Sequence, residues 1–420
     1  MPLIFRPETK RKLLEALTTL YSNAQVLGGL WIALPAQPRP NDLDIIAGPK
    51  SDVFGQLKKY IGDNPIFTFA QSEINRDFEE TQDTTRESIP LTEYPEFEDS
   101  ALIASNILSS LETLPWSYQL AVRLPRPLGN LITNEIGKFD ISPQHRIVPG
   151  TELKDNFPHI TPSASLRLAG LQKGFSGWNT QDAYLTIEMS GYLATDTLTE
   201  PFLAARDDAL SFIGLAVAFD LLTTEGYRLL WEQDRGDPLY VLHQKKYEKW
   251  THVKSIELDH SHKTKISSLT LADDNESGQT AREKLNKISS IFTSEHGTNV
   301  KLASKWLFDS HSSEDALLSY VQAAVAIEIL LGEENKAQDV GLTKLMANRC
   351  AFLIGKTPAA RSNLLKIFPE IYDIRSKIVH RGKSRLSAKE RSLFHALQEI
   401  CTLVIRAEQE LIAHDQKKAH

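Results

Sequence analysis

The feature that most constrains the fold of this chain is a change of character near residue 275. The segment Asp273–Thr280 (DDNESGQT) is polar and acidic with a single glycine, a composition typical of a linker. After it, apolar residues recur at intervals of three or four, which is the period of amphipathic helices. We therefore expect residues 276–420 to form an all-α helical bundle, preceded by a different region over residues 1–275.

Start and stop signals divide the second region into helices. Thr357-Pro358 is a typical N-cap and first-turn pair, and Ser387–Glu390 has the pattern of a capping box. Gly382 follows an apolar run, as a glycine beyond a helix C-terminus does, and Pro369 is expected to restart the helix that ends near His380. The expected helices are 281–292, 299–308, 312–331, 341–354, 358–380 and 387–414.

Residues 1–275 mix helical and strand-like patterns, which predicts an α+β region of one or two subdomains. Helices are expected over 7–20, 99–114 and 200–222, and strands over 118–124, 183–192 and at several places within 227–271. The proline-rich segment 34–44 predicts an irregular connection. Residues 73–99 contain ten acidic residues against two basic ones, so we expect a solvated loop there.

Composition excludes several classes of protein. With 41% apolar and 24% charged residues the chain resembles an average globular protein, and no apolar run of about 18 residues predicts a membrane span. The first residues have no continuous apolar core of a secretion signal, and two cysteines fit a reducing compartment, so we expect a cytoplasmic protein. Nucleotide-binding loops and the common hydrolase motifs are absent from the sequence.

Isolated histidines are the remaining candidates for metal chemistry. Asp259–His262 (DHSH) has metal-binding residue types but no evident third ligand, so a solvated turn in a strand or loop is the simpler interpretation. His145 and His159 are expected to be surface residues or satisfied polar groups. We therefore expect neither a metal nor a cofactor.

Residues 371–380 (IYDIRSKIVH) place an arginine beside the apolar face of an expected helix. Arg375 lies about 40° from Ile371 and about 60° from Ile378 on a helical wheel, at the margin of the buried face. A guanidinium in that position needs a partner or a function. Its partner could be a carboxylate such as Asp373 or Glu328, which is the structural alternative to a functional role.

His380 follows Arg375 by five positions, about 140° round a regular helix. The two side chains therefore do not share one helical stripe. They can converge only if the helix ends near His380, as Gly382 suggests, or if two copies of the chain face each other. The Arg-x-x-x-x-His pattern alone is weak, because it occurs by chance in many sequences.

Three segments together resemble the HEPN superfamily of helical bundles, most closely its Apea-like branch. They are AIEILLG at residues 326–332, NRCA at 348–351 and YDIRSKIVH at 372–380. Their order and spacing agree with the family as well as their residues, and the resemblance covers about a third of the chain. One departure is Arg381, which stands between the histidine and Gly382, where the family has glycine directly after the histidine.

The resemblance implies a metal-independent endoribonuclease that acts at a cleft between two HEPN domains of a homodimer. It also implies an effector of prokaryotic antiviral defence, which cleaves RNA in abortive infection. Arg375 and His380 would then be the catalytic residues. The supporting candidates are Glu328, Asp373, Ser376 and Arg349, each with a structural alternative, and the candidates for contact with the RNA backbone are Lys377, Arg381, Lys383 and Arg385.

Charge is distributed unevenly along the chain. Residues 281–420 contain 21 Lys and Arg against 16 Asp and Glu, a net charge of +5, which leaves −12 for residues 1–280 out of the total of −7. Seven basic residues lie within 375–391, opposed by one glutamate, which is compatible with a phosphate-binding track or with a solvated loop. No aromatic residue accompanies them, so base stacking is not predicted there.

Other functions stay open at this point. The second hypothesis is that the bundle is a non-catalytic dimerisation or binding module, because HEPN folds also serve as scaffolds. A third reading is a different enzyme within residues 1–275. Under the ribonuclease hypothesis, residues 1–275 form a sensing or regulatory part that responds to a phage-derived or nucleotide trigger.

Overall fold

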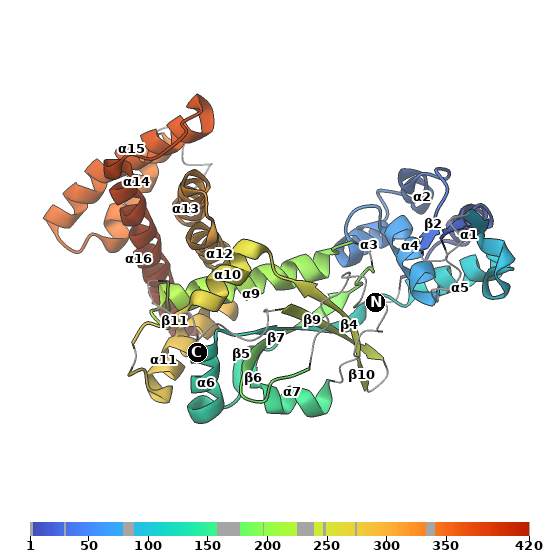
Figure 1. Ribbon diagram of the computed structural model, residues 1–420. Coiled ribbons are helices and arrows are strands. Elements are labelled where there is room, and N and C mark those ends of the chain that lie inside the picture. Colours follow the sequence, from blue (N-terminus) through green and yellow to red (C-terminus); the bar gives the residue numbers. More distant parts are fainter. Residues whose placement is uncertain are drawn as a thin grey trace. The chain divides into compact units, whose positions relative to one another are not determined.

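The computed structural model describes residues 3–28, 31–78, 88–157, 177–195, 197–224, 239–246, 249–273, 275–332 and 341–419. They form two compact units, one from Met1–Tyr118 with Glu188–Ala205 and the other from Gln119–Ile187 with Arg206–His420. Figure 1 shows their elements. The units are not divided at residue 275 as the linker suggested. Helices after that position belong to the same unit as the main sheet.

The first unit is a helical cluster around a small sheet. Its helices are α1 (Pro7–Ser22), α2 (Pro40–Ala47), α3 (Asp52–Ile61), α4 (Pro65–Asp77) and α5 (Ser100–Glu112). The strands β1 (Gln25–Leu27), β2 (Trp31–Ala33) and β3 (Ser88–Pro90) pair antiparallel in the order β2-β1-β3. Two 3₁₀ turns, η1 (Leu91–Glu93) and η2 (Pro95–Phe97), lead into α5. The expected helices over 7–20 and 99–114 are confirmed.

Two expectations for this unit are wrong. The acidic segment is not one solvated loop, because its first residues end α4 and its last part forms β3, η1 and η2, with Leu91 and Phe97 buried. Residues 79–87 of that segment lie outside the described residues. The proline-rich segment 34–44 is not wholly irregular either. Pro40 begins α2, where the Asp42 carboxylate accepts the Arg39 backbone N–H at 2.9 Å.

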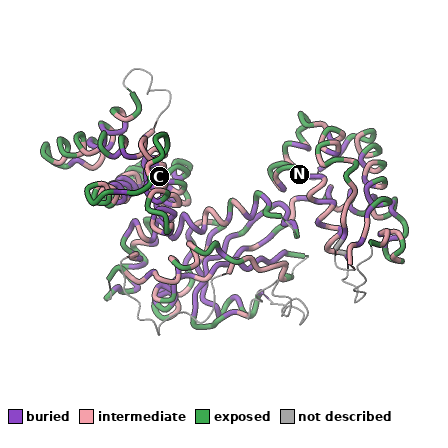
Figure 2. Tube along the Cα trace, turned by 45° about the horizontal axis from the view of Figure 1, so that its top comes forward, coloured by how far each residue is buried: buried purple, intermediate pink, exposed green. Residues whose placement is uncertain are grey.

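The second unit is built on a six-stranded sheet in the order β10-β9-β4-β7-β6-β5. The strands of this sheet are β4 (Trp116–Arg123), β5 (Phe139–Ser142), β6 (His145–Pro149), β7 (Ala183–Gly191), β9 (Leu239–Lys246) and β10 (Lys249–Glu257). The first residues of β4 and the last residues of β7 fall within the first unit. The β5–β6, β6–β7 and β9–β10 pairs are antiparallel. Strand β7 is buried along most of its length, and Figure 2 shows the buried residues gathered along the inner strands. The strands expected over 118–124 and 183–192 are confirmed.

Short elements and one long helix complete the sheet layer. They are α6 (Arg126–Leu131), the π-helical turn η3 (Ile132–Ile136), α7 (Gly150–Asn156), α9 (Glu200–Ala218), β8 (Leu222–Thr223), α10 (His260–Ser268) and β11 (Thr270–Leu271). The expected strands within 227–271 are confirmed only in part. Residues 227–233 lie outside the described residues, and α10 occupies most of the stretch before β11.

The described helices after the predicted linker form a helical region, as expected. They are α11 (Gly278–Phe292), α12 (Thr298–Ser312), α13 (Ala316–Leu331), α14 (Leu342–Ile354), α15 (Pro358–Arg381) and α16 (Ala388–Ala419), with the 3₁₀ turn η5 (Glu295–Gly297) before α12. The α12 helix lies directly on α9. A Cβ atom at Gly214 would come within 2.1 Å of the Ser304 carbonyl oxygen, so only glycine permits this approach. Within the described ranges, no helix is both long and apolar enough to cross a lipid bilayer.

Candidate functional site

The segment 371–380 lies in the second half of α15, which is one uninterrupted helix. The Thr357 side chain accepts the Ala360 N–H at 3.1 Å at its start, and Gly382 closes it in the left-handed region at φ 63°. The expected restart at Pro369 is wrong. Pro369 and Leu365 are both exposed, so the carbonyl that loses its backbone donor can be hydrated and the helix continues.

Arg375 lies on the side of α15 that faces α13. Its Nε is 3.4 Å from Oε1 of Glu328, and the two side chains are 29% and 26% exposed. Asp373, the other expected partner, instead pairs with Lys377 at 2.5 Å. The Glu328 carboxylate is thus an ion-pair neighbour of the guanidinium, while Nε of Arg375 is buried and has no hydrogen-bond partner among the described residues. This ion pair agrees with the structural alternative and leaves a functional role open.

Tyr372 lies beneath this ion pair, and the sequence had not assigned it a role. Its hydroxyl donates to Sδ of Met346 at 3.4 Å, and its ring stacks on Phe368 with centroids 5.5 Å apart. Burial, followed by the negative charge of Glu328, raises the pKa of Tyr372 far above its usual value, so the phenol stays neutral. The signal for this position was its spacing, three residues before Arg375 on a helix.

His380 is exposed one residue before the end of α15, next to Val379, which is 47% exposed. Because the helix is regular up to Arg381, the separation of about 140° between positions 375 and 380 holds. No contact joins Arg375 to His380 within the described part of this chain. A single copy therefore does not bring the two residues together.

The other supporting candidates have mostly structural surroundings. Arg349 on α14 donates from Nη1 to the Leu331 carbonyl at 3.1 Å, which satisfies a carbonyl in the last turn of α13. The side chains of Asp373 and Lys377 form an i,i+4 pair at the surface. Ser376 is partly exposed beside Arg375. Of the supporting set, Glu328 forms an ion pair with the candidate catalytic residue Arg375.

The candidate backbone-binding residues divide into paired and unpaired cations. Lys377 is paired as described, and Lys383 lies 2.9 Å from Glu390. The Ser387 backbone N–H, followed by Lys383, lowers the pKa of Glu390 to about 2, so this carboxylate remains charged. Arg381 and Arg385 are exposed and form no ion pair with any described residue. These two arginines are the cations most available to an anion near His380.

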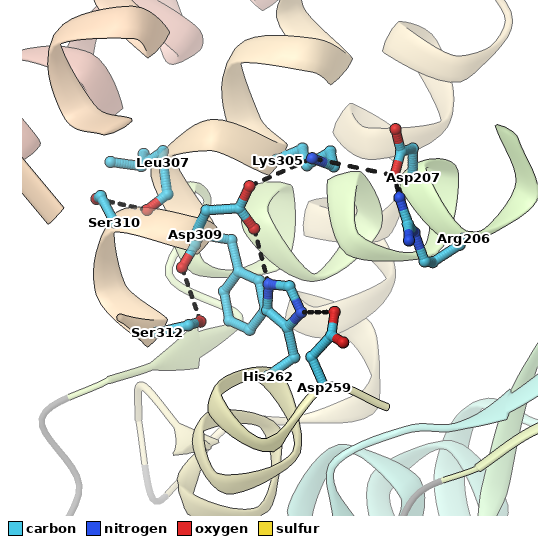
Figure 3. A network of polar contacts seen from close by, with 10 residues as sticks. Arg206, Asp207, Asp259, His262, Lys305, Leu307, Asp309, Ser310 and Ser312 are labelled. Atoms are coloured by element: carbon cyan, nitrogen blue, oxygen red, sulfur yellow. Dashed lines mark hydrogen bonds and ion pairs between the residues drawn. The ribbon is translucent and has the colours of Figure 1, made fainter. Parts of the chain in front are cut away.

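Of the two histidines in Asp259–His262, His262 belongs to an ionic network at the start of α10 (Figure 3), whereas His260 is exposed. His262 Nε2 is 2.8 Å from Asp309 and its Nδ1 is 3.6 Å from Asp259, while Lys305 is 3.3 Å from Asp309. In the described ranges, no three His, Cys, Asp or Glu side chains are grouped to hold a metal ion. The expected solvated turn is wrong, because His260 begins the helix α10 and His262 is largely buried.

His145 is a satisfied, buried polar group, as one of the two expected readings had it. Its Nδ1 is 2.7 Å from Ser142 Oγ, and its Nε2 is 3.1 Å from Asp208, which also binds Lys301 at 3.0 Å. Serine, histidine and carboxylate in this order resemble a hydrolase triad. The histidine, however, is 5% exposed and its ring packs on Phe292 with centroids 4.8 Å apart. We therefore infer that these hydrogen bonds have a structural role and stabilise the β5–β6 hairpin. His159 lies outside the described residues.

Comparison with protein-family models, with curated proteins and with solved structures gives no significant match. The resemblance to HEPN proteins therefore depends on the three sequence motifs alone.

Proposed function

We propose that this chain is a metal-independent endoribonuclease of the HEPN type. The observation that carries the proposal is the arrangement on α15, where an exposed His380 at the helix end follows a half-buried arginine whose Nε lies 3.4 Å from Glu328. The two unpaired arginines beside it, Arg381 and Arg385, add the positive charge that an RNA backbone requires.

The chemistry needs no more than these residue types. The 2′-hydroxyl of RNA attacks the adjacent phosphate, so no metal-activated water is required. A histidine near its ordinary pKa can move a proton at neutral pH, and a guanidinium can bind phosphoryl oxygens as negative charge develops. The products would carry a 2′,3′-cyclic phosphate and a 5′-hydroxyl.

The active unit in this proposal is a homodimer. Because Arg375 and His380 lie on different faces of one helix, the arginine of one copy would work with the histidine of the other across the interface. Residues 1–275 would sense a phage-derived or nucleotide trigger and restrain the nuclease. The protein would then act in the cytoplasm as an abortive-infection effector.

The test uses purified full-length protein with a single-stranded RNA. Arg375→Ala and His380→Ala should each lower the cleavage rate at least about 100-fold, and cleavage by the native chain should persist in EDTA. His414→Ala is the matched control, because it removes another exposed histidine outside the motif. A cleavage rate unchanged in both motif variants would remove the catalytic assignment.

Mixing the two inactive variants tests the composite site. A dimer of one Arg375→Ala copy and one His380→Ala copy retains an intact arginine and an intact histidine across the interface. Cleavage should therefore return to about a quarter to a half of the native rate after subunit exchange. If both single variants are inactive and mixing restores nothing, the two residues work within one copy and the dimeric site is wrong.

The second candidate is a non-catalytic dimerisation or binding module. The ion pair between Arg375 and Glu328 favours it, since that pair gives the arginine a structural partner. Under this alternative the native chain binds RNA or itself without cutting, and the motif variants change neither property.

A further inference from the structure

The first unit contains a pocket that the sequence did not indicate. Its volume is about 510 Å³, and it lies between the segment that leads into α1, the end of α2 and the turn that leads into α3. Small-molecule sites in proteins typically measure about 300–1,000 Å³. Phe5, Ile46 and Val53 form its apolar wall, and Arg6 and Lys50 contribute positive charge. The pocket therefore combines an apolar wall with cationic groups.

The turn that forms one wall is fixed before any ligand arrives. Gly48 adopts φ +82°, and its carbonyl accepts the Ser51 backbone N–H at 2.8 Å. The Ser51 hydroxyl donates to the Ala47 carbonyl and accepts the Phe54 N–H, both at 3.2 Å. A ligand would therefore not have to order this wall, which lowers the entropic cost of binding.

The two cations of the pocket differ from the basic residues of α1. Three basic residues of α1 are each paired with a glutamate, at 2.6 to 2.9 Å: Lys10, Arg11 and Lys12. Arg6 and Lys50 are exposed and form no ion pair with any described residue. Asp52 also lines the pocket, in the first turn of α3, where the helix dipole favours an acid. The lining keeps a net positive charge.

The rim of the pocket also exposes apolar surface. Ile4, which contributes to the lining, is 73% exposed. A large aliphatic side chain at the mouth of a preformed pocket fits a ligand with an apolar body. We propose that this pocket binds a small organic anion that carries one phosphate or carboxylate group on an aromatic or aliphatic body. This assignment is independent of the ribonuclease proposal.

The binding test uses full-length protein and the fluorescent probe anilinonaphthalene sulfonate, which has an anionic group on an aromatic body. Its fluorescence should rise to saturation with one site per chain. Adenosine monophosphate and octanoate then compete for the probe and distinguish a phosphate from a carboxylate ligand. Inorganic phosphate, which has no apolar body, should displace the probe at least tenfold less well than the better of the two.

Variants place the probe in the pocket. Lys50→Glu and Arg6→Glu should each weaken binding of the probe at least tenfold, and Val53→Trp should abolish it by filling the space. Lys59→Glu is the matched control, because it makes the same charge reversal at an exposed position of α3 outside the pocket. Unchanged binding in Lys50→Glu and Arg6→Glu, or no saturable one-site binding to the native chain, would overturn the assignment. Both charge variants change exposed residues, so they remain informative if Val53→Trp does not fold.

Discussion

Two histidine-containing regions of the second unit have opposite surroundings. His262 is 15% exposed in its side chain, lies between two carboxylates and belongs to a network that ties α10 to α12. His380 is exposed at the end of α15, and the nearby Arg375 forms an ion pair with Glu328. Both regions contain residue types that could serve catalysis. Only the second leaves its histidine open to a substrate.

The difference teaches how to separate structural from functional polar groups. Burial makes an unpaired charge costly, so buried histidines and acids acquire partners and then hold elements together. A group that acts on a substrate must instead keep its hydrogen-bonding atoms accessible. By this criterion the networks of His262 and His145 are structural, and the end of α15 is the candidate site.

The largest stability effect should come from the buried network. Asp309→Ala removes the carboxylate that binds both His262 and Lys305, and leaves the largely buried Lys305 with Asp207, 3.9 Å away. Because this second carboxylate compensates part of the buried charge, we expect a loss of about 2–3 kcal/mol in the free energy of unfolding, measured by urea denaturation. Asp373→Ala, at the exposed pair with Lys377, should cost less than about 1 kcal/mol. Equal losses in the two variants would remove the distinction between the regions.

A third histidine, His311, tests the contrast between buried and exposed histidines through the pH dependence of stability. His311 on α12 accepts a hydrogen bond at Nδ1 from Nε2 of Gln398 at 3.2 Å. Burial, followed by the charges of Lys265 and His395, lowers its pKa to about 4. Because this pKa lies below that of the unfolded chain, its contribution to stability is complete above about pH 6.5 and is lost as the pH falls toward 4.

Replacing this histidine should therefore flatten the acid limb of the stability curve. His311→Gln should reduce the loss of unfolding free energy between pH 7 and pH 4 by up to about 3 kcal/mol. The slope with pH is the measured quantity, so any constant destabilisation by the substitution does not interfere. His414→Gln, at an exposed histidine, should leave the slope unchanged. The prediction fails if both variants keep the native slope.

Local signals predicted helix boundaries well where the chemistry is local. The Thr357 cap, the Ser387–Glu390 capping box and Gly382 lie where the sequence placed them, because a cap depends on a few neighbouring residues. The predicted helix restart at Pro369 was wrong, because the effect of a proline inside a helix depends on whether water can hydrogen-bond to the carbonyl that loses its donor. The predicted solvated loop over residues 73–99 was also wrong, because the many acidic residues outweighed the two apolar residues that are buried there, Leu91 and Phe97.

Long-range contacts could not be predicted in the same way. The helices after residue 275 bind the sheet layer through contacts such as Ser289 Oγ with the Ile141 carbonyl at 2.7 Å, far apart in sequence. The sequence offered two carboxylates, Asp373 and Glu328, as partners of Arg375. That Glu328 is the partner could be seen only from the packing of α13 on α15. The pocket beside Lys50 was invisible because its walls come from three separate segments.

The smallest expected effect is on the salt dependence of RNA binding. It compares basic residues that form an ion pair with those that form none with any described residue. RNA binding is measured in full-length His380→Ala protein, which should not cut the RNA, as a function of salt. Each phosphate contact contributes a slope of about −0.7 in log K against log salt for a single strand. Arg381→Ala with Arg385→Ala should reduce the slope by about 1.4 and weaken binding severalfold, because both side chains are exposed without an ion pair to any described residue.

The matched pair of lysines supplies the control. Lys377 and Lys383 already bind Asp373 and Glu390, at 2.5 Å and 2.9 Å, so an RNA phosphate would have to displace a carboxylate from each. Replacing both lysines with alanine should therefore change the salt slope by less than half as much as replacing both arginines. An equal change would mean that RNA opens these surface pairs at little cost, as weak exposed ion pairs allow, and the backbone track would then include all four cations.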